Sequence, residues 1–134
     1  MSYFLSESDI QHLCHSYAQA HLSFDEPIPS FDTRFRDRLE SALASPQRSQ
    51  YTTLAQQAAT LFYEMVKQHP FLNGNKRIAC VTLLVFLALN NKWLETGWKE
   101  LYDIAITVAS SKTENRDGII RLLGEFVKNS LVKK

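Results

Sequence analysis

The side chains best suited to chemistry lie in nine consecutive residues, His69-Pro70-Phe71-Leu72-Asn73-Gly74-Asn75-Lys76-Arg77. An imidazole such as that of His69 can accept a proton near neutral pH. A helix that begins near Asn75 presents unpaired backbone N–H groups and the positive end of its dipole. Gly74 lacks a Cβ, so it permits a tight turn and the close approach of a ligand. The stretch therefore predicts a general base beside a phosphate cradle, which favours group transfer from a nucleotide.

Each residue of the cradle contributes differently. We expect an anion to lie over Gly74, Asn75 and Lys76, with Arg77 adding positive charge. An arginine can bind phosphate through two parallel hydrogen bonds, whereas a lysine acts as a point charge. Taken singly, these residues are more typical of a surface turn and a solvated helix start. The joint pattern is far more specific.

The stretch resembles the motif of the Fic/Doc family, HxFx(D/E)GNxR in one-letter code. The match runs through five positions: His69, Phe71, Gly74, Asn75 and Arg77. Lys76 replaces the glycine that is usual in the adenylylating branch, and Cys80 stands where that branch has an arginine. These two differences look like the Doc, or death-on-curing, branch. The segments 36–46 and 85–90 are also similar to Doc-type proteins.

The resemblance implies an all-α Fido fold and transfer from ATP to a hydroxyl of a protein. In the family, the position of His69 is the general base, and those of Asn75, Lys76 and Arg77 hold phosphate. Doc-type toxins phosphorylate elongation factor Tu and are silenced by a small antitoxin protein, whereas most other Fic proteins transfer AMP. The leading hypothesis is therefore a Doc-like toxin that transfers the γ-phosphoryl group of ATP. The alternatives are AMP transfer and a degenerate, non-catalytic module that binds a nucleotide or a partner.

Asn73 departs from the family motif, because the family has an acidic residue there that helps to hold Mg²⁺. Magnesium prefers anionic oxygen, although it is often bound mainly through substrate phosphates and water. The amide oxygen of Asn73 is a neutral ligand. We therefore expect the binding of Mg²⁺ to be weakened rather than lost.

Size and charge restrict the class of protein. The 134 residues suit a single domain, 1–134. The net charge of +1 gives no overall attraction to nucleic acid or an anionic membrane. The longest apolar run, Ile78 to Leu89, holds 12 residues, and a membrane span needs about 20. The N-terminus lacks the pattern of a signal peptide. Together with two cysteines expected to be buried and reduced, these features predict a soluble cytoplasmic domain.

Apolar periodicity predicts a compact bundle of about six helices with minimal β structure. The first helix follows a Ser6 cap, and a loop is expected from Leu22 to Thr33. The expected helices after this loop are 34–44, 52–68, 75–90, 98–110 and 115–127. In the first of these, Phe35 is expected to face inward with Leu39, Ala42 and Leu43. The helix that follows the motif is apolar nearly all round, so we expect it to be the buried central helix. Short strands are expected at 3–5 and 93–96, a solvated mixed-charge face at Arg34, Arg36 and Arg38, and a frayed end at 133–134.

Overall fold

The computed structural model describes residues 2–17 and 27–133, and within these ranges it is an all-α fold. Six α-helices are present in the described residues: α1 (Glu7–Tyr17), α2 (Arg36–Ala44), α3 (Leu54–Lys67), α4 (Asn75–Leu89), α5 (Trp98–Ser110) and α6 (Arg116–Ser130). The same residues contain three single turns of 3₁₀-helix, η1 (Phe31–Thr33), η2 (Ser45–Gln47) and η3 (Thr113–Asn115). The predicted fold class is confirmed, and α5 has the expected bounds.

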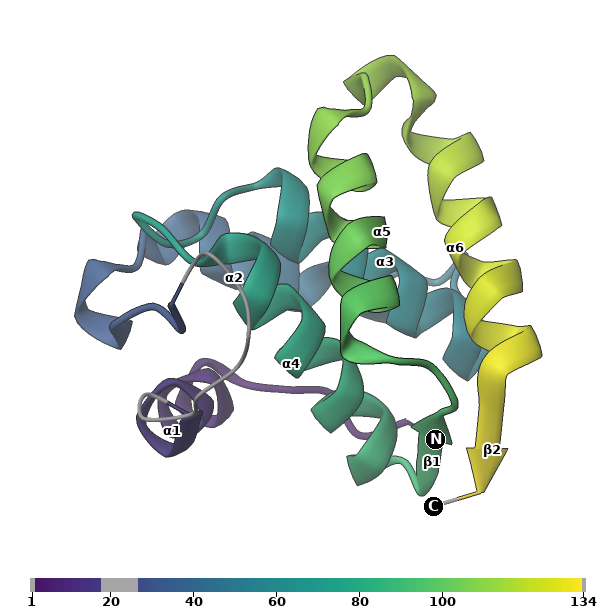
Figure 1. Cartoon of the computed structure of the whole chain (residues 1–134), viewed down its shortest axis with the longest axis horizontal. Coiled ribbons are helices and arrows are strands. Elements are labelled where there is room, and N and C mark those ends of the chain that lie inside the picture. The colour runs from purple at the N-terminus through teal and green to yellow at the C-terminus, as the bar shows by residue number, and fades with distance from the viewer. Residues whose placement is uncertain (1, 18–26, 134) are drawn as a thin grey trace.

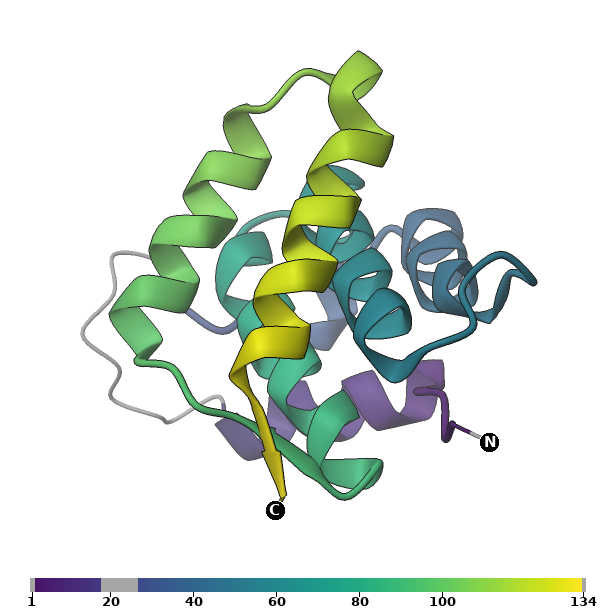
Figure 2. The same cartoon turned by 90° about the vertical axis from the view of Figure 1, so that its right-hand side faces the viewer.

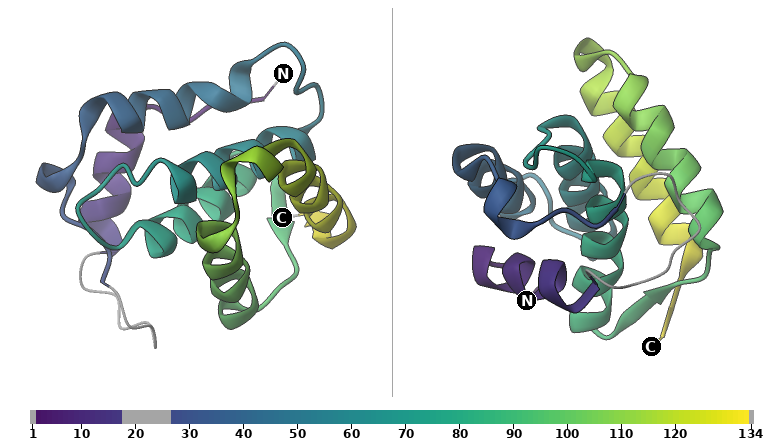
Figure 3. Two further views of the ribbon diagram at one scale, coloured as in Figure 1. Left: turned by 90° about the horizontal axis from the view of Figure 1, so that it is seen from above. Right: turned by 60° about the vertical axis from the view of Figure 1, so that its left-hand side comes forward.

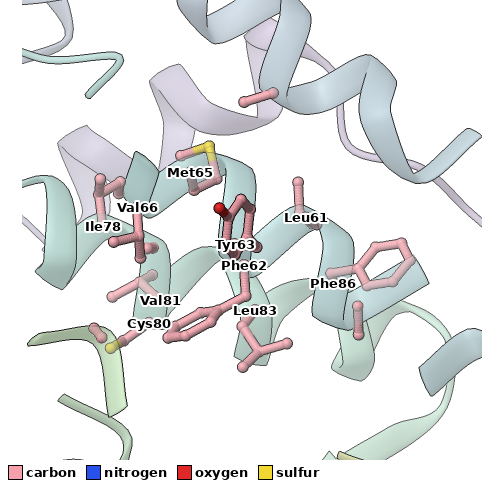
Figure 4. Close-up of a cluster of buried hydrophobic side chains, with 14 of the residues drawn as sticks. Leu61, Phe62, Tyr63, Met65, Val66, Ile78, Cys80, Val81, Leu83 and Phe86 are labelled. Atoms are coloured by element: carbon pink, nitrogen blue, oxygen red, sulfur yellow. The ribbon is translucent and has the colours of Figure 1, made fainter. Parts of the chain in front are cut away.

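Two helices, α3 and α4, form the centre of the molecule (Figures 1 and 4). The side chains of α3 from Gln57 through Val66 are all buried, and their aromatic members Phe62 and Tyr63 are each 1% exposed. In α4, burial is complete from Ile78 to Leu83, but Leu89 at its end is 48% exposed. The prediction of one central helix was therefore incomplete, because α3 shares that position with α4.

Polar caps fix where two of the helices begin. The Thr53 hydroxyl accepts a hydrogen bond from the Gln56 backbone N–H, and the Gln56 side chain accepts one from the Thr53 backbone N–H. This reciprocal pair satisfies two N–H groups that α3 would otherwise leave open. At α1, the Ser6 hydroxyl accepts from the backbone N–H of Asp9, which confirms the predicted cap.

The remaining helices cover the central pair on opposite sides. Helices α1 and α2 lie on one side, and α5 and α6 form an antiparallel hairpin on the other (Figure 3). Helix α6 packs along α3, while α5 packs on both α4 and α3. Figure 2 shows α6 crossing in front of the central helices and continuing directly into the last strand. The core is thus a single cluster to which all six of these α-helices contribute side chains.

A two-stranded antiparallel sheet joins β1 (Lys92–Leu94) to β2 (Leu131–Lys133). Trp93 is paired with Val132 at its middle and is 43% exposed. The expectation of a frayed end at Lys133 was wrong, since its backbone belongs to β2, and Lys134 lies outside the described residues.

The expected strand at 3–5 does not form. The backbone N–H of Tyr3 donates to Asn90 Oδ1 at 2.7 Å, and the Tyr3 carbonyl accepts from Asn90 Nδ2 at 3.0 Å. A side-chain amide thus replaces the neighbouring strand. The N-terminal segment is held at the end of α4 without a sheet.

The segment before α2 also differs from expectation. Residues 31–33 of the expected loop form η1, and residues 22–26 lie outside the described ranges. Helix α2 begins at Arg36, two residues after the expected start, and Phe35 is 41% exposed rather than inward. Arg36 and Arg38 are exposed, as expected for a solvated face, but Arg34 is partly buried and its Nε donates to Glu7 of α1 at 2.7 Å. Within the described part of the chain, no helix is both long enough and apolar enough to cross a membrane.

Candidate functional site

The loop between α3 and α4 carries the histidine of the candidate site. Helix α3 ends at Lys67, and Pro70 prevents it from continuing because proline lacks a backbone donor. His69 lies between them with a φ of 47°, in the left-handed region that a residue with a Cβ seldom adopts. Its side chain is exposed. The backbone therefore turns sharply at the residue predicted to be the base and leaves its imidazole open to a substrate.

Gly74 is the residue at which the chain turns into α4. It precedes the first helical residue with a φ of 72°. A Cβ at this position would overlap the carbonyl oxygen of Pro27 and lie 2.9 Å from Cδ of Pro29. Only glycine fits this backbone and this space. In the structure the segment at Pro27 and Pro29 makes this close approach, so the predicted approach of a ligand to Gly74 stays a prediction.

Asn75 closes the loop on itself. Its Oδ1 accepts a hydrogen bond from the backbone N–H of Phe71, and its Nδ2 donates to the Phe71 carbonyl, each at 2.9 Å. The same Nδ2 lies 3.5 Å from Nδ1 of His69. Asn75 is 6% exposed and Phe71 is 1% exposed, as expected for a core anchor. The amide thus fixes the distance between the histidine and the start of α4.

The two cations follow at the first turn of α4. Lys76 is half-buried, and Arg77 is only 4% exposed. No acidic residue lies in the first turn of this helix. Positive side chains therefore reinforce the positive end of the helix dipole, which is the electrostatic setting that binds phosphate.

Residues at the beginning of α2 form hydrogen bonds with the backbone of the loop, and the sequence analysis did not predict these contacts. The backbone N–H of Phe35 donates to the Pro70 carbonyl at 2.7 Å, and Arg34 and Phe71 form an isolated antiparallel bridge. Arg38 Nη1 donates to the carbonyl oxygen of His69 at 3.3 Å. These contacts join residues more than thirty positions apart, so no local pattern could have indicated them.

The motif implies two bound groups, a nucleotide phosphate chain and Mg²⁺, and the residues of the loop do not fit both equally well. The helix terminus and Lys76 suit a phosphate chain, whereas the space where a Gly74 Cβ would stand is filled by Pro27 and Pro29. For Mg²⁺, the exposed Asn73 offers one neutral oxygen. In the described ranges, no three His, Cys, Asp or Glu side chains gather closely enough to hold a metal ion. The donor set therefore fits a magnesium ion that is held chiefly by nucleotide phosphates.

Other reactive or hollow places lie apart from this loop. Cys14 and Cys80 are both buried, and burial raises the pKa of the Cys14 thiol to about 11, which suppresses its reactive thiolate. One groove of about 630 Å³ runs between the start of α3 and α6, and another of about 690 Å³ runs between α5 and α6. Their linings include neither His69 nor Gly74. The residues suited to catalysis therefore lie in the α3–α4 loop, outside both grooves.

The sequence model described as Fic/DOC family matches residues 4–87, well over half of the chain. This range spans α1 to α4 except for the last residues of α4, and it includes the whole candidate site. A search of curated proteins found no match.

Proposed function

The chain belongs to the Fic/DOC family, and from this premise we propose that it transfers the γ-phosphoryl group of ATP to a hydroxyl of a protein. Members of the family generally transfer groups derived from nucleotides to proteins. One observation carries the proposal. The exposed imidazole of His69 is tied through Asn75 to the N-terminus of α4, where Lys76 adds positive charge.

The reaction requires three contributions from these residues. The amides after Gly74, together with Lys76 and Arg77, bind the triphosphate and stabilise the charge of the transition state. His69 accepts the proton of the attacking hydroxyl. A bond forms between that oxygen and the γ-phosphorus while the bond to the bridging β–γ oxygen breaks, and ADP leaves. Magnesium, held by the phosphates with the Asn73 oxygen beside it, would neutralise part of the phosphate charge.

Lys76 favours phosphoryl over AMP transfer. The side chain is half-buried at the start of α4, so it occupies space and brings charge where a glycine would leave an opening. We propose that this directs the γ-phosphorus, rather than the α-phosphorus, toward His69. AMP transfer remains the second candidate, because it needs the same base and the same cradle.

The proposed biological setting follows the Doc branch. The target would be a translation factor, with elongation factor Tu as the first choice, and the regulator would be a small antitoxin protein. Both would act in the cytoplasm. Lys76 and Cys80 support this setting, because at these two positions of the motif the chain resembles Doc-type proteins.

Two labelled nucleotides test the reaction. The purified chain is incubated with Mg²⁺ and elongation factor Tu, or a cleared bacterial lysate, and with ATP labelled on either the γ- or the α-phosphorus. We expect label in a protein band from γ-labelled ATP only, and no label with His69→Ala. Label from α-labelled ATP would establish AMP transfer instead. If calorimetry shows that ATP binds, but no protein is labelled from either the γ- or the α-phosphorus, the chain is a binding module.

A further inference from the structure

Arg38 makes a contact with the candidate site that its position in the sequence does not suggest. It lies in the first turn of α2, and its Nη1 reaches the carbonyl oxygen of His69 at 3.3 Å across 31 positions of the chain. Its guanidinium carbon lies 4.3 Å from the centre of the Phe35 ring. Stacking on an aromatic face restricts an exposed arginine that would otherwise sample many rotamers. The guanidinium is therefore held in place by both the ring and the carbonyl.

The peptide that Arg38 contacts is one that needs support. A residue with a Cβ at a positive φ, such as His69, costs about 1 kcal/mol or more, and it persists only where neighbours hold it. Two consecutive carbonyls accept hydrogen bonds from the start of α2: that of His69 from Arg38, and that of Pro70 from the Phe35 backbone. On the inner side, Asn75 holds the Phe71 backbone.

We infer that Arg38 is a positioning residue, which holds the His69 peptide in its left-handed conformation and so aims the imidazole at the acceptor hydroxyl. The inference rests on the proposed function for its catalytic consequence. Arg38 reaches the backbone of His69, not the imidazole. Its effect is therefore geometric, and misplacing a base by about 1 Å can cost on the order of a hundredfold in rate.

A matched pair of variants tests the catalytic effect. Arg38→Leu removes the donor, and Arg36→Leu removes another exposed cation from the same helical turn, whose partners are Glu40 and Glu7 rather than the loop. We expect Arg38→Leu to lower kcat by about ten- to a hundredfold with little change in the KM for ATP. Arg36→Leu should leave both constants near those of the parent. Arg38→Lys should recover part of the loss, because an ammonium group can donate to the same carbonyl.

A second readout does not depend on activity. The backbone and imidazole NMR signals of His69, identified by their loss in His69→Ala, should shift or broaden in Arg38→Leu and stay unchanged in Arg36→Leu. Unchanged His69 signals in a folded Arg38→Leu protein would overturn the inference, as would an unchanged kcat. If the parent chain transfers no group, the proposed function fails, yet the NMR comparison still decides whether Arg38 holds His69.

Discussion

Gly74 and Asn75 stabilise the conformation of the same loop in different ways. Gly74 contributes the absence of a side chain, since its backbone has a φ of 72° and its α-carbon faces the Pro27 carbonyl. Asn75 contributes two hydrogen bonds to a single buried residue, Phe71. The motif predicted both positions, but it assigned Asn75 to phosphate. In the structure its amide is bonded to the loop, so phosphate binding by Asn75 stays a prediction.

Replacing Gly74 by alanine should damage both stability and activity. The left-handed backbone costs an alanine about 1–2 kcal/mol, and the overlap with Pro27 adds to this, so we expect a loss of at least about 2 kcal/mol in the free energy of unfolding. Urea unfolding measures it. Gly124→Ala is the control, because nothing lies within 4 Å of a Cβ there and the residue is helical. That substitution should stabilise by about 0.5–1 kcal/mol. Equal losses in both variants would contradict the argument.

Asn73→Asp should lower the Mg²⁺ concentration needed for transfer. The side chain is exposed beside the cradle, and a carboxylate is a stronger ligand for a hard cation than a neutral amide. Titration of the initial rate with Mg²⁺ at fixed ATP gives the half-saturating concentration, which should fall by several-fold. An unchanged requirement would mean that the nucleotide alone holds the metal.

Lys76→Gly should reduce phosphoryl transfer, because it opens the start of α4 and removes one charge from the cradle. The variant should also allow some transfer of AMP. Intact-mass spectrometry of the target separates the two products. A parent protein that already adds AMP would refute the role given to Lys76.

At the scale of the elements, α3 and α6 are joined by an ion pair as well as by apolar packing. Arg116 Nε lies 3.4 Å from Glu64 Oε1, and its Nη1 donates to the Tyr51 hydroxyl at 3.3 Å. The side chains of Arg116 and Glu64 are 24% and 11% exposed. Glu64 also accepts from Gln68 Nε2 at 2.7 Å. The carboxylate is thus largely removed from water and depends on its partners.

Arg116→Ala should therefore destabilise the chain by about 2 kcal/mol, since it leaves the Glu64 charge without its cation in a poorly hydrated place. The double variant Arg116→Ala with Glu64→Gln should recover part of that loss, because the uncompensated charge is gone. Urea unfolding of the parent, the two single variants and the double variant gives the coupling energy. Lys99→Ala serves as the control: the Lys99–Asp103 pair is 87% and 58% exposed, so its loss should cost about 0.5 kcal/mol or less. A similar small cost for Arg116→Ala would refute the argument.

Prediction from sequence worked best where a signal was local. The bounds of α5 and the start of α4 followed from apolar periodicity and from Gly74. A strand was expected at 93–96, and β1 forms at Lys92–Leu94, but its partner β2 was missed because three residues carry too weak a pattern on their own. Phe35 was placed inward because it fits the periodicity of α2, yet it lies before the helix and supports the Arg38 guanidinium. The pairing of β2 and the position of Phe35 both depend on contacts between distant segments of the chain. Contacts of the same kind hold the His69 loop.

At the scale of the whole molecule, the hydrophobic core extends further along the chain than the family match does. The match ends at residue 87, whereas the core continues into α5 and α6 through Leu101, Ala105, Leu123 and Val127. Helix α6 covers α3, and α3 leads directly into the site loop. We therefore propose that residues 1–134 form one cooperative domain. On this view, the last two helices are required for the site even though the family pattern does not include them.

The two tryptophans allow a direct test of this proposal. Trp93 in β1 and Trp98 at the start of α5 both lie beyond the matched range, so their fluorescence reports on the C-terminal part, whereas far-UV circular dichroism reports on all the helices. A single cooperative domain gives the same thermal midpoint by both probes. Val127→Ala truncates a side chain of α6 that is 2% exposed, and it should lower both midpoints equally, at a cost of about 1–3 kcal/mol. If fluorescence changes first while most of the helical signal persists, residues beyond 87 unfold separately, and the single-domain proposal fails.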